Sequence, residues 1–136
     1  MANKKIEEVE GIGPATGEKF REAGVPNTDK LLVRGKTPAG RAELAEATGL
    51  GEKQILRFVN MADLFRIKGV GGEFAELLEA GGVDTVVELA GRNAANLQAK
   101  LEEVNAEKKL TRRVPALAEV ERWVKEAGTL PRGVEY

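Results

Sequence analysis

The chain has 136 residues, of which 42% are hydrophobic and 32% are charged, and its formal net charge is −1. It contains no Cys, no His and no Ser. These absences exclude disulfides, imidazole or thiolate metal sites, and the Ser-His and Cys-His pairs of nucleophilic enzymes. The near-neutral charge also excludes a general electrostatic attraction to nucleic acid.

The acidic pairs of the sequence, such as Glu7 and Glu8, lie in polar surroundings and lack the apolar pocket that would shift a catalytic pKa. We therefore expect no enzyme activity, no cofactor, no metal and no small-molecule substrate. No stretch approaches the roughly eighteen apolar residues of a membrane helix, and the first ten residues lack a signal peptide's apolar core. These features predict a cytoplasmic protein without a membrane partner.

The first half of the chain carries start and stop signals for a series of short helices. Pro14 follows Gly13 where a helix tolerates proline best, and Gly24 is a typical helix stop. Either Asn27 or Thr28 can cap a short helix over 31–33.

The middle of the chain continues in the same way. Thr37 and Pro38 predict the start of a helix over 39–47, which Gly49 ends. Apolar residues then recur at helical spacing from Ile55 to Phe65. They predict the longest helix of the chain, over about 51–67.

The second half predicts the same order of helices, over 72–80, 85–90, 94–104 and 116–127. Thr85 and Glu88 form a capping-box pattern, Asn93 is a cap, and Pro115 opens the last helix. Before its last helix the second half has seven residues more than the first half has at the matching place. They lie within residues 106–113, "AEKKLTRR", where we expect a variable loop.

Residues 9–25 and 67–83 carry an internal repeat. The same residues recur at a constant offset of 58: Gly11/Gly69, Gly13/Gly71, Glu18/Glu76, Gly24/Gly82 and Val25/Val83. Such an offset indicates a duplication. We expect one repeat over 4–66, a second over 63–128 that shares the long helix, and a tail over 129–136. The positions that match between repeats or recur at helical spacing predict a buried core of Ile12, Phe20, Ile55, Phe58, Val59, Phe65, Val70, Leu78, Leu89 and Trp123.

Each copy of the repeat has an apolar residue, Gly-apolar-Gly, and a helix with a small residue at Gly17 or Ala75. This pattern resembles the helix-hairpin-helix motif. With "REAGV" and "ADLFRIKGVG.EFAELLEAGGVDTVVELA", almost the whole chain resembles a bacterial and archaeal family of tandem helix-hairpin-helix proteins of unassigned function. The resemblance implies an all-α fold, in which two helix-hairpin-helix (SAM-like) repeats pack with pseudo-twofold symmetry. It also implies distant relatives that hold DNA backbones.

A turn of this kind ends at a helix N-terminus, where free N–H groups and a partial positive charge suit a phosphate. The only dense basic cluster lies in the expected loop, and on a helix its members would share one side. The weaker cluster of Arg34, Lys36 and Arg41 brackets a predicted helix start. The candidate nucleic-acid-binding residues are Gly11, Ile12, Gly13, Ala15, Lys19, Lys108, Lys109, Arg112 and Arg113.

The two hairpins differ just after the second glycine, where DNA-gripping hairpins usually carry Lys or Arg. The first copy has Ala15 and the second has Glu73, whose carboxylate repels phosphate. The leading hypothesis is therefore weak, sequence-independent contact with a DNA or RNA backbone through the first hairpin and one basic cluster. The alternative is a protein-interaction or scaffolding module with purely structural hairpins. A dinucleotide site at "GIGPATG" is disfavoured because no apolar strand precedes it.

Overall fold

The computed structural model describes residues 3–136, and over this range the fold is all-α. A 3₁₀ helix, η1, precedes the α-helices, and a single antiparallel bridge between Lys5 and Asn27 is the one β-type pairing of the described residues. The elements are η1 (Ile6–Glu8), α1 (Pro14–Glu22), α2 (Thr28–Arg34), α3 (Pro38–Thr48), α4 (Glu52–Leu64), α5 (Gly72–Ala80), α6 (Val86–Ala90), α7 (Ala94–Lys108) and α8 (Leu117–Ala127). None of the helices in 3–136 is long and apolar enough to cross a membrane.

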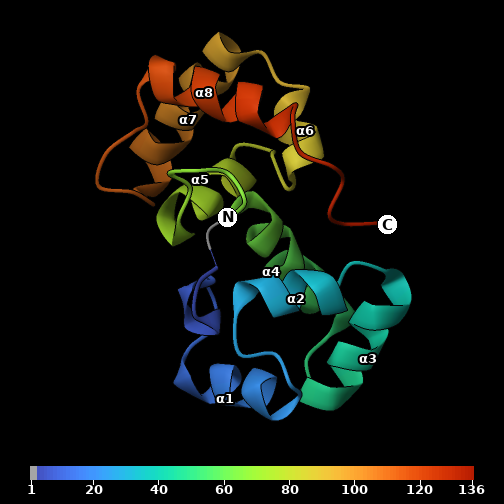
Figure 1. The fold of residues 1–136 in the computed structure, drawn as a ribbon. Helices are drawn as coiled ribbons and strands as arrows, with labels where there is room; N and C mark the ends of the chain where they lie inside the picture. Colours follow the sequence, from blue (N-terminus) through green and yellow to red (C-terminus); the bar gives the residue numbers. More distant parts are fainter. Residues whose placement is uncertain (1–2) are drawn as a thin grey trace.

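The helices pack in two groups joined by α4 and α5 (Figure 1). In the first group, α4 lies against α2 and α3, while α1 contacts η1 and α3. In the second, α8 lies against α6 and α7, and α5 contacts α7. Helix α4 also contacts α5, so it links the two groups.

The predicted caps set most helix starts. The side chains of Asn27, Thr37, Thr85 and Asn93 each accept a backbone N–H from the first turn of their helix. A cap of this type stabilises a helix by about 1 kcal/mol because it satisfies an otherwise unpaired donor. Gly49 ends α3 with φ of 76°, as expected for a left-handed helix end.

Three predicted boundaries were wrong. Helix α4 ends at Leu64 rather than near Ile67. Beyond it the N–H groups of Arg66 and Ile67 donate to carbonyls three residues back, those of Asp63 and Leu64, so the chain tightens into turns instead of continuing the helix. The longest helix is therefore α7, with 15 residues against 13 for α4. It continues to Lys108 and shortens the expected loop, while α8 begins at Leu117, one residue after the predicted start.

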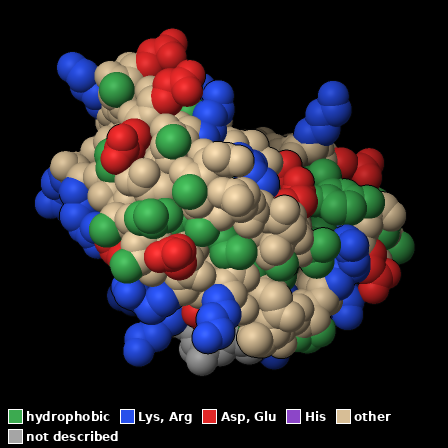
Figure 2. Space-filling model, turned by 90° about the horizontal axis from the view of Figure 1, so that it is seen from above, with side chains coloured by type: hydrophobic (Ala, Val, Ile, Leu, Met, Phe, Trp, Pro, Cys, Tyr) green, Lys and Arg blue, Asp and Glu red, His purple; other side chains and the backbone are tan. Residues whose placement is uncertain are grey.

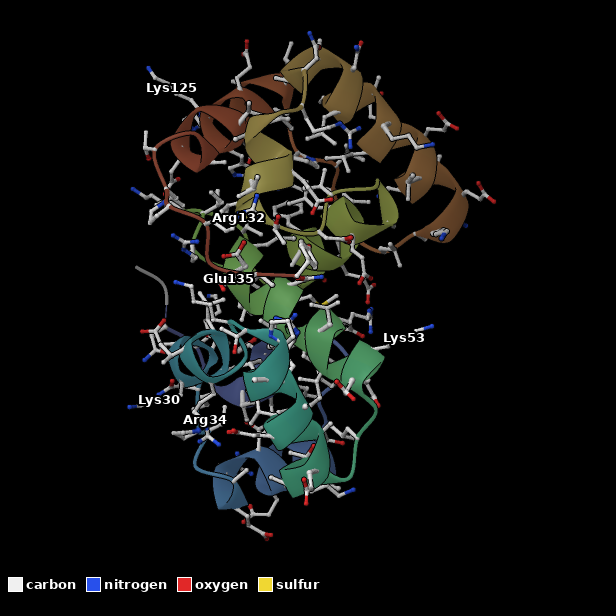
Figure 3. All side chains as sticks on the ribbon, turned by 90° about the vertical axis from the view of Figure 1, so that its right-hand side faces the viewer. Lys30, Arg34, Lys53, Lys125, Arg132 and Glu135 are labelled. Atoms are coloured by element: carbon white, nitrogen blue, oxygen red, sulfur yellow. The ribbon has the colours of Figure 1, made fainter. Side chains whose placement is uncertain are left out.

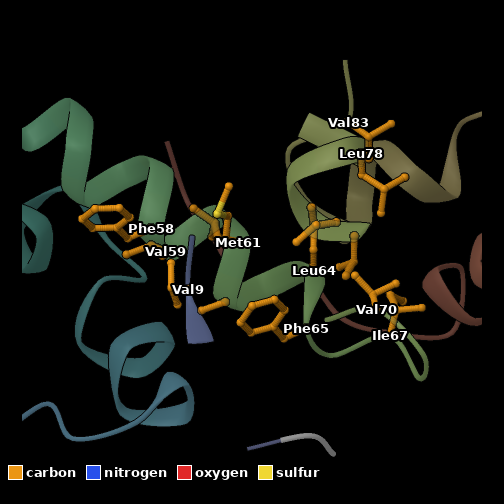
Figure 4. Close-up of a cluster of buried hydrophobic side chains, with 14 of the residues drawn as sticks. Val9, Phe58, Val59, Met61, Leu64, Phe65, Ile67, Val70, Leu78 and Val83 are labelled. Atoms are coloured by element: carbon orange, nitrogen blue, oxygen red, sulfur yellow. The ribbon is translucent and has the colours of Figure 1, made fainter. Parts of the chain in front are cut away.

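One continuous core runs through both groups of helices. All ten residues predicted to be buried are at most 4% exposed. Figure 4 shows the cluster along α4, from Phe58 and Val59 at one end to Leu78 and Val83 near the other group. The shared core explains why α4 carries apolar residues on more than one face.

Asp63 joins the two groups through a buried carboxylate that is 0% exposed. Its Oδ1 accepts a hydrogen bond from Arg66 at 2.8 Å, and its Oδ2 accepts one from the N–H of Val86 at 2.9 Å. A buried charge is tolerated only with such partners. The carboxylate thus holds the start of α6 against the end of α4.

The last residues do not extend away from the second group. Val134 is buried, and the N–H of Glu135 donates to the carbonyl of Lys36 at 2.8 Å. Figure 3 shows Arg132 and Glu135 where the two groups of helices meet. The segment predicted as a tail therefore packs against the α2–α3 connection of the first group.

Candidate nucleic-acid interface

The first turn, residues 9–13, brings η1 into α1 with a backbone that requires glycine at one position. Gly11 has φ of 95°, and a Cβ there would lie 3.0 Å from Cε1 of Phe58. Ile12 is buried and donates its N–H to the carbonyl of Val9 at 3.0 Å. Gly13 then caps α1, and Pro14 occupies its start. The turn is anchored by its buried residue and exposes its glycines.

The exposed side of the first turn presents unpaired donors. Gly13 and Ala15 are exposed and Thr16 is half-buried, and none of their N–H groups meets an acceptor within residues 3–136. The first N–H to be paired in α1 is that of Gly17, which donates to the carbonyl of Gly13 at 2.8 Å. Lys19 is exposed on the same helix. The predicted residues of the first turn therefore lie together.

The arginines beside the first turn are paired with carboxylates, and two further carboxylates lie close to each other there. Glu7 forms an ion pair with Arg21, which lowers the pKa of the Glu7 carboxyl. Arg57 holds Glu79 at 2.8 Å, and its Nη1 lies 3.4 Å from the Cβ position of Gly11. Burial raises the pKa of Glu76, as does the negative charge of Glu10 beside it. The cations next to this turn are therefore largely neutralised.

The second turn, residues 67–71, repeats the same backbone. Gly69 has φ of 90°, buried Val70 donates its N–H to the carbonyl of Ile67 at 3.1 Å, and Gly71 caps α5. Its surroundings differ, because a Cβ on Gly72 would lie 2.7 Å from the carbonyl oxygen of Glu8. Segment η1 therefore packs on the start of α5, where the matching Pro14 of the first turn is exposed.

The basic cluster lies beside the second turn, not the first. Arg112 Nε is 3.7 Å from the carboxylate of Glu73 on α5. The Arg113 guanidinium lies 5.2 Å from the centre of the Phe74 ring, within cation–π range. Figure 2 shows Lys and Arg side chains gathered on the side where Figure 1 places the α7–α8 loop. The structure thus separates the two parts of the predicted site.

The basic cluster does not share one helix face, because half of it lies in the α7–α8 loop. Lys108 is the last residue of α7, Lys109 ends the helix with φ of 52°, and Arg112 and Arg113 lie in the loop. Arg113 is already paired with both carboxylate oxygens of Glu119, at 2.7 and 2.9 Å. With the N–H of Ala116, it lowers the pKa of Glu119 to about 2. Arg113 is therefore the least available cation of the cluster.

The chain matches, over residues 10–130, a family model described as a domain of unknown function, DUF4332. The chain belongs to the DUF4332 family. The match includes all eight α-helices, and it confirms the expectation of a family without an assigned function. No solved structure matches the chain at a significant level.

The weaker basic group of this DUF4332 protein has a structural role at its centre. Arg41 is 6% exposed, and it donates to the carbonyls of Gly35, Lys36 and Glu135 at 2.7–3.0 Å. Because Arg41 is buried and its guanidinium donates to these three carbonyls, it does not present its charge to a phosphate in solvent. Arg34 donates to the carbonyl of Ala23. The sequence did not distinguish Arg41 from its exposed neighbours, although its place three residues before buried Leu44 is a helical-face signal.

The acidic side chains of residues 3–136 do not gather into a metal centre. Within the described part of the chain, no group of three or more acidic side chains has the arrangement of a metal site. The geometry is therefore one of exposed backbone donors and of surface cations.

Proposed function

We propose that this protein is a non-catalytic module of two helix-hairpin-helix repeats, which contacts the phosphate backbone of DNA or RNA weakly and without sequence preference. The contact is made by the first turn. Its amides would hold a phosphate oxygen, and Lys19 would add a nearby charge. This assignment rests on the exposed N–H groups of Gly13 and Ala15, which lack an acceptor within residues 3–136.

The same physical features account for the weakness of the proposed contact. Hydrogen-bond donors at a helix start attract an anion, but each counts for less in water than in a buried site. The nearby Arg21 and Arg57 are already paired with carboxylates. With a net charge of −1 the protein has no long-range attraction for DNA. We therefore expect dissociation constants in the non-specific range of roughly 10⁻⁴–10⁻⁶ M at physiological salt.

Lys108, Lys109 and Arg112 supply a second, purely electrostatic area of contact. All three are exposed, and Arg112 is paired only with the exposed carboxylate of Glu73. A backbone that reaches this area gains from neutralised phosphates and loses from the Glu73 carboxylate. The two areas are separate, so each can be altered without the other.

A protein-interaction module is the second candidate. The observation that favours it is the pairing of Arg21, Arg57 and Arg113 with Glu7, Glu79 and Glu119. Arginines that are paired with carboxylates of their own chain have less charge to offer to phosphates. In this alternative both turns are only architecture.

Fluorescence anisotropy with labelled duplex DNA and single-stranded RNA, measured across a salt series, tests the proposal. Ala15→Glu places a carboxylate beside the free amides and should weaken binding several-fold. Ala42→Glu adds the same charge at an exposed position of α3 and is the matched control. Circular dichroism checks that both variants fold.

The opposite charge change sharpens the test at the second turn. Glu73→Lys removes the carboxylate and frees Arg112, so binding should tighten and its salt dependence should steepen. Glu43→Lys on α3 is the control of equal charge. Absence of salt-dependent binding at low ionic strength, with all four variants folded, would exclude the nucleic-acid proposal and favour the protein-interaction module.

A further inference from the structure

A surface pocket lies between the second turn and α8. Its volume is about 360 Å³, and it is lined by Lys68, Gly69, Glu119, Arg122, Trp123 and Glu126. This volume lies within the range of roughly 300–1,000 Å³ that is usual for small-molecule sites. The pocket forms only when the turn meets the helix, since its walls come from segments about 50 residues apart.

The side chain of Trp123 brings a polar atom, its indole nitrogen, to the pocket. Trp123 is 3% exposed, yet its N–H donates to no acceptor in the described chain. Its Nε1 faces the second turn, because it would lie 3.5 Å from a Cβ at Gly69. Among residues 3–136, Asn60 Oδ1 is the one side-chain polar atom that is both fully buried and without a partner. The unpaired indole nitrogen of Trp123 is therefore not fully buried, and the pocket is where solvent reaches it. Buried Trp N–H groups usually find a partner.

Two cations of the pocket are also unpaired. Lys68 and Arg122 are exposed and take no part in the ion pairs of residues 3–136. The indole N–H, the ammonium of Lys68 and the guanidinium of Arg122 are all hydrogen-bond donors without acceptors. Together they describe a site for an anion.

The two carboxylates of the pocket are already engaged. Glu119 accepts from Arg113 and from the N–H of Ala116 at 3.0 Å. Glu126 accepts from the N–H of Lys68 at 3.1 Å. The lining holds two cations, Lys68 and Arg122, and two carboxylates. Arg113, which lies outside the lining, neutralises Glu119, so the remaining groups carry a net charge of +1. A singly charged anion neutralises this pocket, whereas a doubly charged phosphate would overcharge it.

We propose that this pocket binds a small organic monocarboxylate, which accepts hydrogen bonds from the Trp123 indole N–H and from Arg122, with Lys68 at its rim. Such a ligand would bridge the second turn and α8. It is a binding function separate from the nucleic-acid contact, and it departs from the expectation of no small-molecule ligand because the donors come together only in the fold.

Trp123 is the only tryptophan, so its fluorescence reports on the pocket directly. We would titrate the protein with sodium acetate and sodium butyrate at constant ionic strength, with chloride as the balancing salt. Saturable changes with half-saturation in the millimolar range are expected, since few atoms contribute binding energy. The indole N–H resonance in a ¹H–¹⁵N spectrum should shift along the same curve.

Arg122→Gln should weaken acetate binding at least tenfold. Lys125→Gln removes the same charge from an exposed position of α8 that does not line the pocket, and should leave binding unchanged (Figure 3). Because Trp123→Phe removes the indole reporter, its effect is followed through the amide resonances of Lys68 and Gly69, which should no longer shift.

Three results would overturn the proposal. They are a fluorescence response that fails to saturate, a response that Arg122→Gln leaves intact, and equal binding of inorganic phosphate in a parallel titration. The last result would show a general anion surface instead of a carboxylate site.

Discussion

The two turns have the same backbone and different neighbours. Gly11 and Gly69 have φ of 95° and 90°, and each turn buries two aliphatic side chains and ends at a helix start. The first turn is open, with Pro14 exposed on its surface. The second is covered by the Glu8 carbonyl at Gly72, and Arg112 pairs with Glu73 beside it. A repeated backbone does not imply a repeated surface.

The sequence differences between the turns follow from this packing. Gly72 stands where the first copy has Pro14, and its lack of a side chain lets η1 approach α5 closely. Aromatic residues at matching places lie against both turns, Phe58 at Gly11 and Trp123 at Gly69. The two turns thus have an aromatic side chain against the same glycine position, whereas their exposed surroundings differ.

The largest expected effect comes from these two aromatic side chains. Phe58→Ala and Trp123→Ala should each lower the free energy of unfolding by about 3–5 kcal/mol, because both side chains are at most 3% exposed. Urea denaturation of both variants measures it. A loss below about 1 kcal/mol at Trp123, with a large loss at Phe58, would show that the two aromatics are not equivalent.

An intermediate effect should appear where the exteriors differ. Gly72→Ala forces a Cβ to within 2.7 Å of the Glu8 carbonyl and should cost about 1–3 kcal/mol, as overpacking does. Pro14→Ala at the open turn should cost under about 1 kcal/mol, mainly through a freer unfolded chain. Thermal and urea unfolding compare the two. Because alanine is the better helix former, stabilisation by Gly72→Ala would mean that η1 does not press on α5.

The smallest effect concerns the ion pairs beside each turn. The pKa of Glu119 is lowered from 4.5 to about 2, so its pairing stabilises the fold above about pH 4.5 and is lost as the pH falls toward 2. Arg113→Gln should raise this pKa, measured by carboxyl NMR titration, and should flatten the stability profile in that window. The change in stability should be small because the pair lies at the surface, where solvent screens it.

The same substitution at the first turn is the matched comparison. Arg21→Gln should raise the pKa of Glu7, which Arg21 lowers by a hydrogen bond. An unchanged Glu7 pKa would mean that this ion pair does not persist in solution.

Local rules in the sequence were enough to place most of the helices and the core. Caps at Asn27, Thr37, Thr85 and Asn93 act over three residues, and the burial of Phe58 and Trp123 follows from helical periodicity. The two glycine turns were equally visible, because positive φ is a demand of the backbone itself. Such features depend on neighbours within one or two helical turns, which a sequence displays directly.

Contacts between distant segments were decided by the tertiary structure alone. The sequence grouped Arg112 and Arg113 with the first turn, whereas the α7–α8 loop carries them to Glu73 and Phe74. The sequence placed Arg41 in a candidate basic cluster, whereas the structure pairs it with the carbonyl of Glu135. No sequence pattern indicated that Asp63 would accept a hydrogen bond from the start of α6. The pocket at Trp123 likewise needs a turn and a helix about 50 residues apart. Periodicity shows that a side chain is buried or exposed, but only packing in three dimensions decides which partner it meets.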